Sequence, residues 1–209
     1  MTWDDLPEST SPTFDTMFLT HEPEVEARDA SIELVGTSLR LRCLISLGRF
    51  PRLTDLMSST SGFIRVRDAR LLAADGEPTG DVLPELMIDQ DSITFIAEPD
   101  APLHEPGSGS PPDEFGVGGN PVDRRTRRFA LFTDGHELSG LVYLFGETDM
   151  ASFVESTHPR FIPLTDVTVR SLADHRNLTS YPFVLVNRAR LLAAAELDGG
   201  ADPGGRPGL

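Results

Sequence analysis

The stretch SGFIRVRDARL, residues 61–71, recurs about a hundred residues later as PRFIPLTDVTV, residues 159–169. Both copies share a Phe-Ile pair, an alternating apolar position and an aspartate in register, Asp68 in the first and Asp166 in the second. The match extends outward, because residues 44–48, 53–60 and 93–98 align with residues 142–146, 150–157 and 191–196. A repeat on this scale predicts a doubled small module.

Within each module the apolar residues alternate with period two, which predicts strands. The last two strands are expected over residues 83–88 and 92–97 in the first module, and over 181–187 and 189–194 in the second. One short helix is expected in each module, over residues 52–59 and 148–156, with Thr148 or Asp149 as N-cap of the latter. The predicted fold class is mainly β: two tandem small β-barrels, each with one short α-helix, related by an internal repeat.

Proline, glycine and acidic residues divide the chain into modules and connecting segments. Residues 1–30 form an acidic arm that is expected to be disordered, apart from an apolar spot at Phe14, Met17, Phe18 and Leu19 that is suited to docking. The first β module covers 31–98, a Pro/Gly/Ser-rich acidic linker ending in an arginine cluster covers 99–127, and the second β module covers 128–197. A disordered tail is expected over 198–209.

The net charge of −15 comes mostly from the connecting segments. Residues 1–30 carry eight acids and one arginine, or −7, and residues 99–123 carry five acids and no base, or −5. The stretch 31–98 carries ten acids and seven arginines, or −3, and 124–196 carries eight acids and nine arginines, or +1. The modules are therefore nearly neutral, and the acidity of the whole chain says little about what their surfaces bind.

Two stretches of the second module resemble the sequence motifs of Sm-like proteins. Residues 129–142, FALFTDGHELSGLV, are similar to the first motif, and residues 183–192, FVLVNRARLL, are similar to the second. The resemblance implies a strongly bent five-stranded barrel of the SH3-like kind. Gly135 would allow positive φ in the turn, and Gly140 would relieve crowding where the strand bends.

This sequence departs from the Sm-like pattern at two places. Asn187-Arg188 stands where the second motif usually has an Arg-Gly step, and the first module has Asp89-Gln90 there. The helix between the second and third strands is similar instead to one in an uncharacterised bacterial family of small β-domains, with residues 52–55, RLTD, as the matching insert. That resemblance implies a bacterial origin and transfers no function.

Neither a catalytic nor a metal-binding constellation is expected. The five histidines, at 21, 104, 136, 158 and 175, show no metal-ligand spacing, and Cys43, the single cysteine, alternates with apolar residues as a core position does. No nucleophile, base and orienting group can be assembled. Asp68 and Asp166 are expected to be structural, for example by bonding backbone amides at a strand end. The chain is therefore predicted to be a non-enzyme, with no catalytic residue, metal or cofactor.

The preferred function is that of a scaffold or assembly protein, a homo-oligomer or the partner of another protein, which associates through exposed barrel edges. The alternative is an Sm-like protein that binds RNA or single-stranded nucleic acid and is autoinhibited by its acidic arm. No apolar run reaches the length of a membrane helix and no signal peptide is evident, so a cytoplasmic location without membrane association is expected. The anion or nucleic-acid contacts would come from Arg124, Arg125, Arg127, Arg128, Arg188 and Arg190.

Overall fold

The computed structural model describes residues 28–73, 75–101, 124–145, 149–156, 159–174 and 178–197. Residues 28–101 are called the first half below, and residues 124–197 the second half. The predicted tail, nearly all of the predicted arm and most of the predicted linker lie outside the described residues. The elements of the first half are β1 (Asp29–Gly36), β2 (Arg40–Ser46), α1 (Leu53–Ser59), β3 (Phe63–Leu72), β4 (Pro78–Asp89), the 3₁₀ turn η1 (Gln90–Ser92) and β5 (Ile93–Glu98). Those of the second half are β6 (Arg124–Thr133), β7 (His136–Phe145), α2 (Met150–Glu155), β8 (Phe161–Ser171), β9 (Leu178–Asn187), η2 (Arg188–Arg190) and β10 (Leu191–Leu197).

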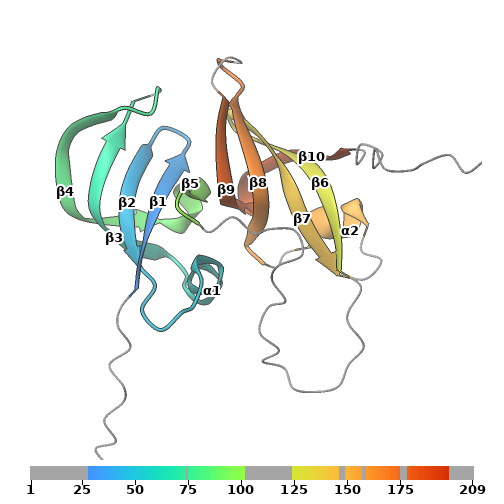
Figure 1. Ribbon diagram of the computed structural model, residues 1–209, viewed down its shortest axis with the longest axis horizontal. Coiled ribbons are helices and arrows are strands. Elements are labelled where there is room, and N and C mark those ends of the chain that lie inside the picture. Colours follow the sequence, from blue (N-terminus) through green and yellow to red (C-terminus); the bar gives the residue numbers. More distant parts are fainter. Residues whose placement is uncertain are drawn as a thin grey trace, which may run out of the picture.

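All ten strands belong to one antiparallel sheet, in the order β10-β6-β7-β8-β9-β5-β1-β2-β3-β4. Figure 1 shows the two halves side by side, blue to green and yellow to red. They are joined where β5 pairs with β9, so the sheet runs across the whole molecule. The predicted mainly β class is confirmed. The pairing nevertheless gives one open sheet instead of two separate closed barrels, because β4 and β10 stand at its two ends.

The elements follow each other in the same order in both halves, and the two predicted short helices are present. The Asp149 side chain accepts a hydrogen bond from the Ser152 amide and so caps α2, as predicted. Asp89 and Asn187 act alike before the last strand of each half, since their side chains accept from the Asp91 and Ala189 amides and start a 3₁₀ turn.

The repeated aspartates occupy equivalent bends in β3 and β8. Asp68 has φ of 50° and Asp166 has φ of 51°, the only non-glycine residues with positive φ in the described part of the chain. The register of β2 with β3 shifts next to Asp68, and that of β7 with β8 shifts next to Asp166, so each lies at a β-bulge. Their predicted structural role takes a different form: they adopt the left-handed conformation in mid-strand, where aspartate is tolerated best after glycine and asparagine.

Two glycines behave as the turn and bend require. Gly135 has φ of 90° between β6 and β7, in the predicted Asp-Gly hairpin. A Cβ on Gly140 would lie only 3.0 Å from a Val167 methyl and 3.1 Å from the Thr165 carbonyl oxygen. The strand can therefore approach the bulge of β8 only because residue 140 has no side chain.

One boundary differs from the prediction in a way that affects the candidate site. β6 begins at Arg124, four residues before the expected start of the second module at 128. Residues 124–128 pair with residues 141–145 of β7, so the arginine cluster is part of a strand and not the end of a linker. The first half likewise begins at Asp29 instead of residue 31.

Candidate functional site

Of the six predicted arginines, the four whose side chains the structure describes each contact a different part of the chain. Arg127 donates to both carboxylate oxygens of Glu196 on β10, at 3.1 Å each, while its neighbour Arg128 donates to Asp166 on β8 at 3.1 Å. Consecutive residues of a strand point to opposite faces of the sheet, which explains why their partners lie on different strands. The side chains of Arg124 and Arg125 lie outside the described part of the structure.

Arg188 and Arg190 hold structural elements together. Arg188 donates to the Phe153 and Val154 carbonyl oxygens, the latter at 3.1 Å, and its guanidinium lies 5.2 Å from the centre of the Phe153 ring. It thereby satisfies the C-terminal end of α2. Burial lowers the pKa of Arg188 from its ordinary value. Arg190 donates to the Asp91 carbonyl oxygen at 2.9 Å and so ties η2 to the first half.

Metal and thiol chemistry find no support in the described residues. No group of three or more His, Cys, Asp or Glu side chains is arranged to hold a metal ion there. Cys43 is 3% exposed, and burial raises the pKa of its thiol to about 12. His136 packs edge-on against Phe95; burial lowers its pKa. The other four histidines lie outside the described residues.

The contact between the two halves, called here the central joint, is the most elaborate arrangement in the molecule. Residues 95–98 of β5 pair with residues 183–186 of β9. The Asn187 amide group, fully buried, donates to the Gln90 carbonyl oxygen at 3.2 Å and to the Ile93 carbonyl oxygen at 2.8 Å. Arg160 adds an ion pair to the Asp91 carboxylate. Sheet pairing and side chains therefore fix the same register.

A buried carboxylate also ties the halves together. Glu33 is 4% exposed and accepts hydrogen bonds from Arg42 at 2.6 Å, from Arg40 at 3.0 Å and from the Tyr181 hydroxyl of the second half at 2.8 Å. Burial by itself would raise the pKa of Glu33, but the hydrogen bonds from Arg42, Tyr181 and Arg40 outweigh it and hold the pKa below its ordinary value. Glu33 is therefore an ionised structural carboxylate.

The joint also buries apolar side chains of the second half inside the first. Phe161 and Leu185 are 2% and 0% exposed and belong to the same buried cluster as Met57 of α1 and Ile96 of β5. The other buried cluster contains most of the core of the second half, including Phe129, together with Val35, Phe95 and Ala97 of the first half. The core of the first half is therefore completed by the second half.

The two end strands expose the positions that the central joint buries. Phe63 of β3 lies opposite Asp89 of the end strand β4, in the same way as Phe161 of β8 lies opposite Asn187 of β9. Phe161 is buried, whereas Phe63 is 63% exposed. Met87 of β4 corresponds in the same register to Leu185 of β9 and is 49% exposed. Leu192 lies at the bulge of β10, and Thr94 lies at the matching bulge of β5. Leu192 is 72% exposed, whereas Thr94 is 1% exposed.

These exposed residues, not the arginines, form the candidate site: Phe63 and Met87 at the β4 edge, and Leu192 at the β10 edge. Sequence reasoning missed them because Phe63 and Phe161 carry the same signal within an alternating strand. The sequence alignment of the repeat pairs Phe63 with Phe161. The alignment does not say which of the two residues will have a further strand packed beside it.

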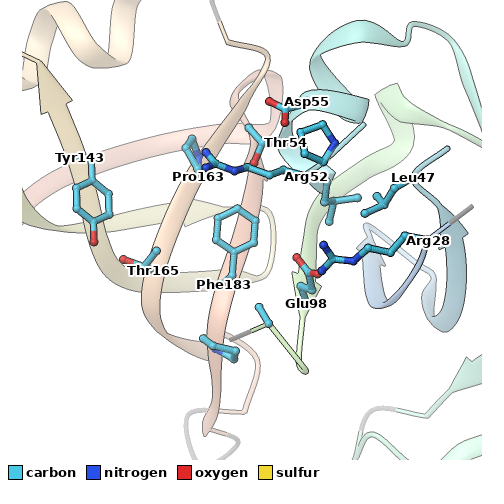
Figure 2. A pocket seen from close by; sticks show the side chains of 14 residues that line it. Arg28, Leu47, Arg52, Thr54, Asp55, Glu98, Tyr143, Pro163, Thr165 and Phe183 are labelled. Atoms are coloured by element: carbon cyan, nitrogen blue, oxygen red, sulfur yellow. The ribbon is translucent and has the colours of Figure 1, made fainter. Parts of the chain in front are cut away.

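A groove of about 450 Å³ lies beside the central joint (Figure 2). The first half contributes Leu47, Pro51 and the start of α1, while the second half contributes Tyr143, Phe183 and two prolines. Arg28 and Glu98 face each other at one side of the groove in Figure 2, and Arg52 lies at the other. Burial raises the pKa of Glu98, and nearby Arg28 partly opposes that effect.

Comparison with known proteins finds no match to this chain among protein-family models, curated proteins or solved structures. Among the described residues, none of the helices has the length and apolar character needed to cross a membrane. The candidate site is therefore argued from its geometry alone.

Proposed function

We propose that this protein is a self-associating scaffold in which β4 of one copy pairs with β10 of the next. The observation that carries the proposal is the contrast between Phe161 and Leu185, buried at the central joint, and their counterparts Phe63 on β3 and Met87 on the end strand β4, which are exposed. Exposed strand edges with apolar side chains are templates for pairing with another chain.

The central joint supplies the geometry for the contact between copies. There Ile96 of β5 lies opposite Leu185 of β9. Applying the same register to the end strands places Ala194 of one copy opposite Met87 of the next. This contact is heterologous, so it generates closed rings or open filaments according to the rotation between copies.

We further propose that each half is one Sm-like module and that the chain is a tandem of two. The common order of elements, the positive-φ aspartates and the matching bulges support this interpretation. Each half is an incomplete unit with one strand offered to a neighbour on either side, and the central joint uses one such pairing within the chain.

The contact between copies is expected to be weaker than the central joint. The donors of the central joint, Arg160, Asn187 and Arg190, correspond in the repeat to Gly62, Asp89 and Ser92 of the first half. The Asp91 carboxylate, which pairs with Arg160, corresponds to Ala189 of the second half. The pairing between copies would therefore lack these polar contacts, so assembly should depend on protein concentration.

Light scattering after size-exclusion chromatography tests the proposal. The mass should rise above 22.8 kDa with concentration for the natural protein, and Met87→Lys or Leu192→Lys should return it to the monomer. Leu178→Lys is the matched control, because Leu178 is 56% exposed but lies on the inner strand β9. A natural protein that stays monomeric at all concentrations contradicts the proposal.

Cysteine cross-linking tests the heterologous register. A mixture of the Met87→Cys and Ala194→Cys variants should form disulfide dimers on oxidation, whereas each variant alone should not. Cross-linking by either variant alone would indicate a symmetric contact and would overturn this register while leaving self-association intact.

Nucleic-acid binding remains the alternative, with weaker support. Four of its six predicted arginines already have partners within the chain. If Arg124 and Arg125 bind RNA, affinity should fall steeply with salt and with Arg124→Ala/Arg125→Ala. Adding RNA at low salt during the light-scattering experiment distinguishes the two functions.

A further inference from the structure

The groove beside the central joint has the composition of a peptide-binding surface. Its walls combine the rings of Tyr143 and Phe183 with those of Pro51, Pro163 and Pro182, and these residues come from both halves. Tyr143 is 43% exposed although it lies on the inner strand β7. Peptide grooves are commonly built in this way, with aromatic and proline rings for contact and a few charged groups at the rim.

The charged rim includes an arginine that the described residues leave unpaired. Arg28 is close enough to Glu98 to affect its pKa. Arg52, at the other side of the groove, makes no side-chain hydrogen bond or ion pair with any residue in the described ranges. Asp55 also lines the groove but forms no ion pair with Arg52, so an occupant that carries acidic side chains beside apolar ones would complement Arg52.

The chain itself carries such a segment, attached at the rim. Arg28 lines the groove and is also the first described residue. The N-terminal arm, residues 1–27, is therefore joined to the described structure at this groove. The arm contains Phe14, Met17, Phe18 and Leu19, with Asp15 within the cluster and Glu22 and Glu24 after it. The nine residues from Leu19 to Arg28 can span up to about 30 Å, so the cluster can return to the groove.

We propose that the apolar cluster at residues 14–19 binds in this groove of its own chain. Phe14 or Phe18 would contact the rings of Tyr143 and Phe183, and the neighbouring acids would lie near Arg52. Tethering at the rim gives the arm a high effective concentration, so a contact that is weak for a free peptide suffices. Because the walls come from both halves, the bound arm would also stabilise the central joint. The proposal is independent of the pairing of β4 with β10.

Photo-cross-linking on the full chain tests it. Phe18 is replaced by the photoreactive residue p-benzoylphenylalanine, and the linked peptides are identified by mass spectrometry. We expect links within one chain to peptides that contain Tyr143 or Phe183, with a yield at least several-fold above that from the same photoreactive residue at Trp3. Tyr143→Ser should lower the yield several-fold, and circular dichroism checks that this variant is folded.

Three outcomes would overturn the proposal. The first is linking from position 18 to the exposed residues Phe63 or Met87 instead of the groove. The second is linking only between chains, which mixed isotope-labelled and unlabelled protein detects and which would identify a second copy as the source of the arm. The third is an equal yield from positions 3 and 18. The light-scattering result for the pairing of copies does not depend on any of these outcomes.

Discussion

Glu33 shows at the scale of one residue how a buried charge is stabilised in this protein. Its carboxylate receives two guanidinium groups and one phenol hydroxyl, and the phenol belongs to the other half of the chain. Removing the charge would leave Arg40 and Arg42 without their common partner. The same network therefore contributes to stability and couples the halves.

Glu33→Gln should lower the free energy of unfolding by about 2 kcal/mol at pH 7, as measured by urea denaturation. Glu85→Gln is the control, because the Glu85 side chain is 55% exposed and pairs with Arg65 at 3.4 Å, so its loss should cost at most about 0.5 kcal/mol. Equal costs for the two variants would contradict the structural role of Glu33.

The contribution of Glu33 should also depend on pH. Its pKa is lowered in the folded state, so the folded protein binds this proton less readily than the unfolded chain, and the stabilisation is fully present above the unfolded value near 4.5. The difference between the natural protein and Glu33→Gln should therefore shrink as the pH falls below this unfolded value and on through the lower pKa of the folded state. A difference that stays constant from pH 7 to pH 3 would show that the charge contributes nothing.

Cys43 should be inert until the protein opens. Because burial raises the pKa of its thiol to about 12, almost no thiolate is present at pH 8. Labelling by an aromatic disulfide reagent at pH 8 should be more than about 100-fold slower in the folded protein than in urea. Rapid labelling of the folded protein would contradict its place in the core.

The bulges of β3 and β8 belong to the scale of the element. Each combines a left-handed aspartate with a register shift, and each bends a strand that is paired on both sides. In the second half, the neighbouring strand β7 approaches the bulge of β8 at Gly140, where the missing Cβ leaves the room that the bend needs. The bend, not the carboxylate chemistry, is what the two aspartates have in common.

Substitutions at Asp68 should separate backbone conformation from side-chain chemistry. Asp68→Val places a β-branched residue at positive φ and should cost about 1–2 kcal/mol of unfolding free energy, whereas Asp68→Gly should stay within about 0.5 kcal/mol of the natural protein. Arg70→Val, on the same strand and exposed, is the control and should be nearly neutral. A large loss for Asp68→Gly would instead assign the role to the carboxylate.

At the scale of the whole molecule, the shared core makes the two halves one cooperative unit. Phe161 and Leu185 complete the first half's core, and Asn187 satisfies two of its carbonyl oxygens. Neither half buries its apolar surface fully alone. The exposed apolar residues of β4 and β10 would in the same way be buried only by pairing with a neighbouring chain, which is the assembly proposed above.

Hydrogen exchange along a urea titration should show both halves unfolding together in the natural protein. Asn187→Ala removes one buried hydrogen bond from each of two carbonyl oxygens, of which that of Gln90 keeps the Ile93 amide as a donor, so it should cost about 1–3 kcal/mol and separate the two transitions. Asp89→Ala is the control at the equivalent position of the first half, where the side chain accepts only from the Asp91 amide. Separate transitions in the natural protein would contradict a shared core.

The sequence by itself determined the mainly β class, both short helices and the turn at Gly135, because strand alternation, helix capping and turn chemistry are local properties of the chain. It also predicted Cys43 as a core residue. It placed residues 124–127 at the end of a linker, since a run of charges carries no signal of the strand that will pair with it.

Only the tertiary structure decided which of two equivalent residues is buried. Phe63 and Phe161 occupy matching strands, β3 and β8, but β9 has β5 on its other side, whereas β4 is paired with β3 alone among the described strands. Whether a strand lies at an edge depends on pairing across about a hundred residues, which no local pattern records. The same long-range pairing distributed the arginines among separate partners and left Phe63, Met87 and Leu192 at the edges, where the proposed function lies.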